Sequence, residues 1–170
     1  MRSAQPIAFM LAAALLAIGL IAPSYALNSK ERKAAKLAEQ AFLEKNGARK
    51  GVVATASGLQ YEILKKSDAD RHPRGSDRMN IHYHGTLIDG AVFDSSLLRG
   101  EPIEVRLWDV IPGWTEGLKL MSPGDKYRFF VPSKLAYGAK GQGIIDPYTT
   151  LVFEIELISI RDRKSKTKKQ

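Results

Sequence analysis

Two histidines on one expected strand, His82 and His84, are the first residues in the sequence that could perform chemistry. With one residue between them they share a face of the strand, as a pair of metal ligands would. A metal site needs three or four ligands, and the third histidine of the chain, His72, belongs to a separate loop. We therefore expect two surface histidines and no metal site.

Other kinds of catalytic motif are missing from the sequence. No Gly-x-Ser-x-Gly segment is present, and no motif pairs a serine with a histidine. Gly138, Gly141 and Gly143 do not form a phosphate-binding loop, because no Gly-Lys-Ser/Thr segment follows them. The absence of cysteine excludes disulfides, thiol nucleophiles and thiolate metal sites. The sequence thus contains no obvious bond-breaking machinery.

Aromatic and apolar residues at the ends of expected strands and loops are a third kind of candidate. Taken singly, each is more commonly part of a core than of a ligand site. Ile144 and Ile145 are unusual, because they stand in a glycine-rich loop that would normally be polar. They suggest a flap over an apolar pocket. The full set is Tyr83, Phe93, Trp114, Tyr137, Ile144, Ile145 and Phe153.

One short helix over residues 110–121 is the element around which the others must be arranged. Its apolar stripe consists of Trp114, Leu118 and Met121, at i, i+4 and i+7. Ser122-Pro123-Gly124 is expected to end it. Because the first amides of a helix lack internal partners, a concave site near Ile111 would offer a hydrogen-bond donor in an apolar wall.

The segments before and after this helix alternate with the period of strands, and Asp89-Gly90 predicts a tight turn between two of them. About five strands therefore bracket the helix, which predicts an α+β fold. The expected strands fall within residues 59–64, 79–84, 92–94, 103–107, 126–131 and 151–157.

Residues 1–26 have the three parts of a secretory signal peptide. Arg2 is followed by an apolar run over residues 7–22 and by small residues before a cleavage point after Ala26. An uncleaved anchor is the alternative, but the run is short and rich in alanine for a membrane span. We expect an exported protein with no stable membrane insertion after cleavage.

Residues 28–46 are expected to form a helix capped by Asn28 or Ser29. Its narrow apolar face would consist of Ala34, Leu37, Ala38, Ala41 and Phe42. Such a helix could pack on the domain, pair with a second copy or remain a frayed lead-in. A solvated connector is the favoured interpretation, because short helices of this kind are marginal alone.

The chain is basic, with a formal net charge of +8, and residues 161–170 contain six basic residues against one acidic. This last segment has no apolar period, which predicts a disordered, solvated tail. It also lacks interleaved aromatic residues, so we expect no specific binding of nucleic acid.

Five motifs in residues 58–160 resemble the FKBP-type peptidyl-prolyl isomerases. They are residues 81–85 (IHYHG), 92–96 (VFDSS), 110–114 (VIPGW), 135–138 (LAYG) and 150–153 (TLVF). Residues 54–61 resemble the secreted Gram-negative branch that includes the macrophage infectivity potentiator proteins, although residues 27–57 leave room for only a short helix and linker. The resemblance implies an antiparallel sheet wrapped around one short helix.

The resemblance also implies a pocket in which Asp94, Tyr137 and Phe93 are the catalytic residues. Trp114 would form its floor. Its walls would be Tyr83, Val110, Ile111, Ile145 and Phe153, with Ile103 where many members have an aromatic residue. Arg99 matches a position that is often basic, whereas Gln142 and Asp146 depart from the best-known members and put the substrate preference in question.

The expected function is a periplasmic peptidyl-prolyl cis-trans isomerase that assists folding of exported proteins, without metal or cofactor. Its partners would be proline-containing polypeptides and macrolide-type inhibitors, and the chain would be a monomer or weak dimer. A non-catalytic chaperone or adaptor that uses the same fold as a binding surface is the alternative. Asp94 raises a further question, because a buried carboxylate is costly without a partner. It could orient the pocket, or only close the Asp89-Gly90 hairpin or bond a strand amide.

Overall fold

The computed structural model describes residues 27–161. This part of the chain forms one seven-stranded antiparallel sheet with three α-helices and a short 3-10 helix, which confirms the α+β prediction. The elements are α1 (Ser29–Gly47), β1 (Val53–Ala54), β2 (Gln60–Lys65), β3 (Arg78–Thr86), β4 (Val92–Ser95), α2 (Ser96–Arg99), β5 (Ile103–Arg106), α3 (Pro112–Leu118), β6 (Lys126–Val131), η2 (Ser133–Leu135) and β7 (Leu151–Arg161). The strand count exceeds the expected five or so, in part because two-residue β1 is too short to show any alternation.

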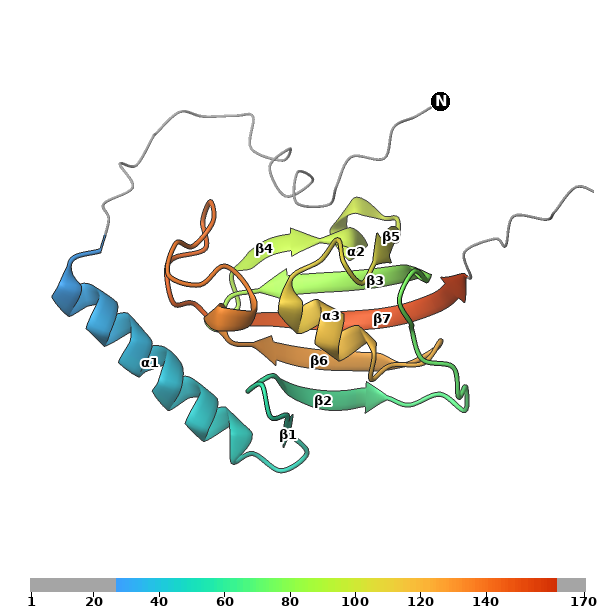
Figure 1. Ribbon diagram of the computed structural model, residues 1–170, viewed down its shortest axis with the longest axis horizontal. Coiled ribbons are helices and arrows are strands. Elements are labelled where there is room, and N and C mark those ends of the chain that lie inside the picture. The colour runs from blue at the N-terminus through green and yellow to red at the C-terminus, as the bar shows by residue number, and fades with distance from the viewer. Residues whose placement is uncertain (1–26, 162–170) are drawn as a thin grey trace, which may run out of the picture.

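The strands are ordered β1-β2-β6-β7-β3-β4, and β5 also pairs with β3 (Figure 1). β4 and β5 therefore share one edge of β3, β5 along residues 78–81 and β4 along residues 84–86. The expected turn at Asp89-Gly90 joins β3 to β4, and the amide of Gly90 donates to the carbonyl of Leu87. α2 lies between β4 and β5 in the sequence. The chain therefore leaves the edge of β3 after β4 and returns to the same edge as β5.

α3 packs on the sheet through the predicted stripe, whose residues Trp114, Leu118 and Met121 are buried. A Cβ atom added at Gly117 would lie 2.6 Å from Cε1 of Phe129 in β6, so a glycine is needed for this close approach. The helix ends at Leu118, earlier than predicted. The chain tightens there into three-residue turns, with the amide of Met121 donating to the carbonyl of Leu118, before it reaches Ser122.

The alternation of β6 and β7 places the expected residues in the core. They are Tyr127, Phe129, Val131, Leu151, Phe153, Ile155 and Leu157, all buried. The alternation in β2 is incomplete: Leu59 is buried, but Ile63 on the same face is 50% exposed, whereas Gln60 on the other face is buried. Phe130 is buried on the face of β6 opposite Phe129. α1 covers Gln60 and Phe130: the Gln60 side chain bonds to Asn46 and to the Leu43 carbonyl, and the Phe42 ring lies 6.3 Å from that of Phe130.

α1 begins as predicted, with Asn28 as its N-cap: the Asn28 side chain accepts from the amides of Lys30 and Glu31, and the Glu31 carboxylate accepts from the Asn28 amide. The interpretation of α1 as a solvated connector was wrong. The helix packs on the domain along a face formed by Glu39, Phe42, Leu43 and Asn46, offset from the predicted apolar stripe. Of that stripe only Phe42 is half-buried, and Leu37 is 57% exposed. The contact is largely polar, which apolar periodicity does not detect.

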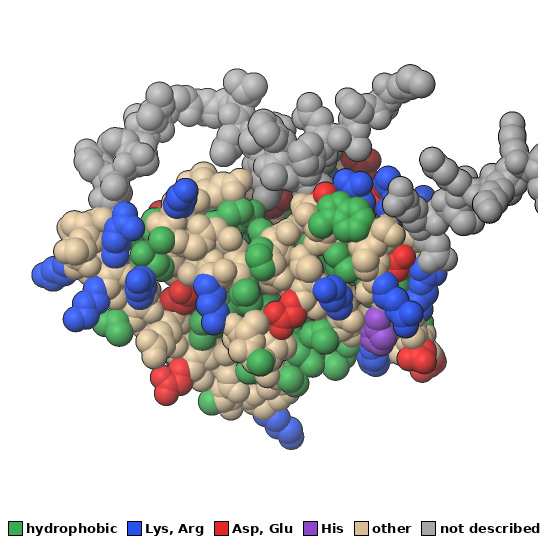
Figure 2. Space-filling model, in the orientation of Figure 1, with side chains coloured by type: hydrophobic (Ala, Val, Ile, Leu, Met, Phe, Trp, Pro, Cys, Tyr) green, Lys and Arg blue, Asp and Glu red, His purple; other side chains and the backbone are tan. Residues whose placement is uncertain are grey.

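The predicted signal peptide and all but the first residue of the predicted tail lie outside the described residues. Arg161 is the last residue of β7, so the strand extends one residue into the segment predicted to be disordered. Within residues 27–161 no helix is long and apolar enough to cross a membrane. On the face shown in Figure 2, Lys and Arg side chains are most numerous toward the two ends, hydrophobic side chains are exposed between them, and acidic side chains are scattered over the face.

Candidate active site

Four of the predicted pocket residues form one aromatic cluster between β3, β4, α3 and β7. The Trp114 ring meets Tyr83 and Phe153 edge to face, each at a centroid distance of 5.1 Å. Phe93 meets Phe153 in the same way, at 5.4 Å and an interplanar angle of 89°. Edge-to-face pairs of this kind add to the stabilisation that burial provides. The indole N–H of Trp114 is buried and has no hydrogen-bond partner among the described residues.

Gly85 in β3 makes room for the outer half of this cluster. It pairs with Asp94 on one side and with Phe153 on the other. A Cβ atom at this position would lie 2.8 Å from Cζ of Phe93 and 3.0 Å from Cε1 of Phe153. The glycine thus allows Phe93 and Phe153 to meet over the strand.

Asp94 is held beside the cluster by two partners. Its carboxylate accepts a hydrogen bond from the phenol of Tyr83 and forms an ion pair with the guanidinium of Arg99. Arg99 also donates to the Tyr83 oxygen at 2.8 Å and lies over the Tyr83 ring. The Asp94 side chain is 14% exposed, so its charge is largely removed from water and compensated. The hairpin alternative is not observed, because the turn is closed by Asp89, which accepts from the amide of Ala91.

The two tyrosines near Asp94 are kept neutral. Burial raises the pKa of Tyr83, and the hydrogen bond to Asp94 adds to the rise, partly offset by Arg99. Burial also raises the pKa of Tyr137, and the charge of Asp94 adds to this second rise. Both phenols therefore keep their protons at neutral pH and can act as hydrogen-bond donors.

Two donors next to the cluster are not engaged within the described part of the chain. The hydroxyl of Tyr137 makes no hydrogen bond there, and neither does the amide of Ile111, which is the N-cap of α3. Both residues are partly buried against the core. The expectation of a free donor at the start of α3 thus agrees with the geometry.

The remaining predicted wall residues surround the cluster at different depths. Ile145 is buried, whereas its neighbour Ile144 is 56% exposed, so only one of the two loop isoleucines packs inward. Val110 and Ile103 are partly buried against the core. Ile103 pairs with Ile81, two residues from Tyr83 on the same face of β3.

His82 and His84 lie on the other face of β3, and each ring lies within hydrogen-bond distance of a serine side chain. The Nδ1 atoms of His82 and His84 each lie 3.0 Å from a serine hydroxyl, that of Ser96 and of Ser95 respectively. Among residues 27–161 no group of three potential metal ligands comes together. The histidine pair has a structural role in linking β3 to the start of α2.

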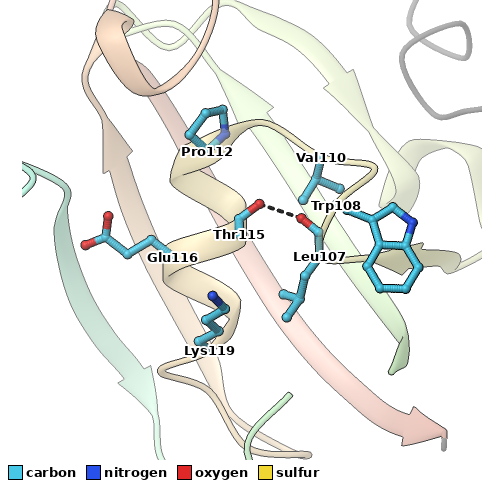
Figure 3. Close-up of a pocket in the computed structure, with 7 residues that line it drawn as sticks. All are labelled: Leu107, Trp108, Val110, Pro112, Thr115, Glu116 and Lys119. Carbon is cyan, nitrogen blue, oxygen red and sulfur yellow. Dashed lines mark hydrogen bonds between the residues drawn. The ribbon is translucent and has the colours of Figure 1, made fainter. Parts of the chain in front are cut away.

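A separate pocket of about 410 Å³ lies between α3 and the segment before it (Figure 3). Its lining residues are Leu107, Trp108, Val110, Pro112, Thr115, Glu116 and Lys119, and the Thr115 hydroxyl donates to the Leu107 carbonyl. Val110 is its one residue from the predicted set. Trp108 is 56% exposed, with the Arg106 guanidinium over its ring. The four residues of the aromatic cluster do not line this hollow, so the two are separate features.

Comparison with known proteins identifies the fold and the motifs. A sequence model of the family described as FKBP-type peptidyl-prolyl cis-trans isomerase matches residues 69–158, more than half of the chain. The chain belongs to this family. A second model, of the domain amino-terminal to FKBP-type peptidyl-prolyl isomerase, matches residues 21–63, which include α1. The resemblance inferred from the sequence motifs is confirmed.

Individual FKBP-type relatives agree with this assignment. The chain is 50% identical over 119 residues to the FKBP-type peptidyl-prolyl cis-trans isomerase FkpA of Aeromonas hydrophila, covering 70% of this chain and 44% of that protein. It is 43% identical over 143 residues to the outer membrane protein MIP of Legionella longbeachae, covering 84% of this chain and 61% of that protein. The crystal structure of a peptidyl-prolyl cis-trans isomerase from Pseudomonas syringae superposes with a TM-score of 0.72 at 41% identity, covering 76% of this chain and 96% of that one. The chain spans about half the length of the curated relatives it matches first.

Sequence reasoning missed two contributors to this FKBP-type site. Arg99 was noted only as a position that is often basic, and its ion pair with Asp94 depends on α2, a four-residue helix without a clear pattern. Gly85 was quoted within a motif but given no role. An isolated glycine in a strand was the available signal, since it indicates close approach of another group.

Proposed function

We propose that the chain catalyses cis-trans isomerisation of X-Pro bonds and so assists the folding of exported proteins. The observation that supports this most is the arrangement of Asp94 beside the edge-to-face cluster of Tyr83, Phe93, Trp114 and Phe153. This apolar wall, in which the charge of Asp94 is balanced by Arg99, would accommodate the apolar ring of a proline residue. Family membership supports the same activity.

The mechanism follows from the physics of the amide. Rotation about an X-Pro bond requires loss of amide resonance, with an uncatalysed barrier of about 18–20 kcal/mol. The planar amide is more polar than the twisted one, so moving it from water to an apolar pocket favours the twisted state. The free hydroxyl of Tyr137 and the amide of Ile111 would hold flanking carbonyls. Phe93 would contact the proline ring, and Asp94 would orient the pocket and polarise the twisted amide. No metal, nucleophile or cofactor is needed for this step.

A proline-specific protease-coupled assay tests the proposal. The cis-to-trans rate of a short prolyl peptide should rise in proportion to the concentration of the chain. The alternative is a non-catalytic chaperone or adaptor that binds its client through the surface of the domain and through α1. An unchanged isomerisation rate, together with suppressed aggregation of an unfolded client, would establish that alternative.

The partners proposed are proline-containing polypeptides and macrolide-type inhibitors, which would compete for the aromatic cluster. Export through a signal peptide in residues 1–26 would place the chain in the periplasm, as the relationship to FkpA and MIP proteins supports. We propose a monomer or weak dimer, because the exposed face of α1 is mostly charged and has few apolar side chains besides alanine and Leu37. Sedimentation of the full chain and of Leu37→Glu measures this, and a tight dimer in both would contradict it.

A further inference from the structure

The loop between β6 and β7, residues 132–150, carries Tyr137 and Ile145 but has little regular structure of its own. It contains the three-residue helix η2 and one isolated bridge, between Gln142 and Ile145. Tyr148 has a left-handed backbone conformation with a φ of 61°, which is costly for a non-glycine residue. Contacts from α1 add to the loop's own backbone bonds in holding it in this conformation.

Glu39 of α1 contacts both ends of this loop. Its carboxylate accepts from the Ser133 amide at 2.6 Å and from the Ser133 hydroxyl at 2.9 Å. It also accepts from the hydroxyl of Thr150, the last residue of the loop, at 3.2 Å. Ser133 and Thr150 are buried, at 5% and 2% exposure, and Glu39 is half-buried, so these bonds are partly shielded from water. Hydrogen bonds to an ionised acceptor in such a setting are among the stronger ones in proteins.

A chain of backbone bonds leads from this contact to Tyr137. The Ser133 carbonyl accepts from the amide of Gly138, at 2.8 Å, which is the residue directly after Tyr137. The Gly138 carbonyl in turn accepts from the amide of Tyr148 at 2.9 Å. Lys36, one turn before Glu39 in α1, lies over the Tyr148 ring at 5.0 Å from its centroid. Side chains of α1 thus contact the loop near its start, at its end and at its strained residue.

We infer that Glu39 is a positioning residue for isomerisation, and that α1 fixes the loop so that the Tyr137 hydroxyl and Ile145 meet the substrate in one geometry. This inference rests on the proposed function. It gives α1 a role within its own chain: a helix outside the sheet supplies the carboxylate that ties the two ends of an active-site loop together.

The test compares Glu39→Ala with Glu44→Ala in the full-length protein. Glu44 is an exposed acid in the same helix whose side chain makes no hydrogen bond or ion pair among the described residues, so this variant controls for the change in charge and for helix propensity. Isomerase kinetics are measured over a range of peptide concentrations, and hydrogen exchange is measured at the amides of Gly138 and Tyr148. For Glu39→Ala we expect kcat/KM to fall roughly threefold to tenfold, chiefly through a higher KM, because Tyr137 would hold the substrate less well. Exchange at Gly138 and Tyr148 should accelerate while the amides of β3 and β7 stay protected, and Glu44→Ala should match wild type.

Glu39→Gln tests whether a side chain of similar shape partly restores substrate binding. It keeps one oxygen for the Ser133 amide, so its KM should lie between wild type and Glu39→Ala. Wild-type kcat and KM in Glu39→Ala would overturn the inference, and so would exchange that accelerates equally in the loop and the central strands, since that would be general destabilisation. An inactive wild-type chain would instead refute the proposed function, a result that is distinguishable because it precedes any comparison of variants.

Discussion

The phenol of Tyr83 donates a hydrogen bond to the carboxylate of Asp94 across the pairing of β3 with β4. The ring of Tyr83 also packs edge to face with Trp114, so one residue joins the charge of the site to its apolar floor. Arg99 completes the arrangement from the solvent side, with 44% of its side chain exposed. The Asp94 charge is therefore oriented by a buried donor and balanced by a cation that water also reaches.

Replacing Asp94 by leucine should preserve the fold and impair isomerisation. The leucine removes a costly buried charge, and Arg99 can turn to water, although the Tyr83 hydroxyl loses its acceptor. We expect turnover to fall by roughly tenfold or more, which is about 1.4 kcal/mol or more of transition-state stabilisation. Thermal melting and isomerase rate should be measured on the same preparation.

Asp94→Asn is the matched control, since it keeps the shape of the side chain and removes only the charge. An unchanged rate with an unchanged melt in Asp94→Leu would exclude Asp94 from the mechanism and leave the apolar walls to account for it. A collapsed fold would show that the carboxylate is structural.

Replacing Gly85 by alanine should displace Phe93. The new methyl group would lie 2.8 Å from the Phe93 ring, which is half-buried and can move outward. We expect a stability loss of about 1 kcal/mol, typical of mild overpacking. The rate should fall by about tenfold, because Phe93 would leave its place over the proposed proline site.

Thr86→Ala serves as the neighbouring control for this prediction. Its side chain is half-buried and points to the other face of β3, so its rate should equal that of wild type. Peptide-assay kinetics with urea unfolding of both variants separates the two effects. A Gly85→Ala protein with wild-type activity would show that the position of Phe93 does not matter.

Most of the core was predictable from the sequence, because its apolar residues recur with the spacing of a helix or of a strand. The stripe of Trp114, Leu118 and Met121 follows the helical period, and the alternation in β7 follows the strand period, so apolar pattern alone places them. Asp89-Gly90 marks its turn by residue type. The resemblance of the five motifs to a known family then suggested roles for individual residues, which a hydrophobic period cannot do.

The docking of α1 could not be predicted in the same way. Its interface depends on Glu39 and Asn46, which form hydrogen bonds to Ser133 and Gln60 over separations of 94 and 14 residues. Polar contacts of this kind leave no apolar period in the sequence. The placement of Arg99 beside Asp94 was missed for a related reason, since it depends on how α2 turns away from the sheet edge.

Asp125 should be a main determinant of stability away from the site. Its side chain is fully buried and accepts from Lys66 Nζ at 2.8 Å, from the Ser67 amide at 2.7 Å and from the Ser122 amide at 2.8 Å. Asp125→Asn puts an amide donor against these donors, and we expect a loss of about 2–4 kcal/mol in unfolding free energy. Urea unfolding measures this loss. Asp68→Asn, at an exposed position, is the control, and its unfolding free energy should lie within about 0.5 kcal/mol of wild type.

This contribution of Asp125 should depend on pH in the acid range. Burial opposes ionisation, but the hydrogen bonds from Lys66, Ser67 and Ser122 outweigh it and lower the pKa of Asp125 below its usual 3.8. A carboxylate with a lowered folded-state pKa stabilises the fold above the unfolded pKa, and this stability is lost as the pH falls through the folded value. The gap between wild type and Asp125→Asn should therefore narrow below about pH 3.8. A constant gap would mean that the charge of Asp125 contributes nothing.

The raised tyrosine pKa values predict behaviour at the alkaline end. Burial, the bond to Asp94 and the Asp94 charge raise the pKa of Tyr83 above its usual 10.0, so the phenol keeps its proton when an unfolded tyrosine has lost it. Because the folded pKa is the higher one, this group leaves stability unchanged below pH 10 and lowers it as the pH rises further. The isomerase rate, measured without a protease, should stay flat up to about pH 10, since Tyr83 and Tyr137 remain protonated.

Tyr83→Phe isolates the contribution of Tyr83 to the loss of folding stability above pH 10. It keeps the ring against Trp114 and removes the ionising group, so its stability should decline less steeply above pH 10 than that of wild type. Below that pH it should be less stable than wild type by about 0.5–1.5 kcal/mol, the usual worth of one hydrogen bond. Unfolding by urea across the alkaline range measures both slopes. Identical slopes for the two proteins would show that Tyr83 ionises in the folded chain as freely as in the unfolded one, and the buried hydrogen bond to Asp94 would then not be holding its proton.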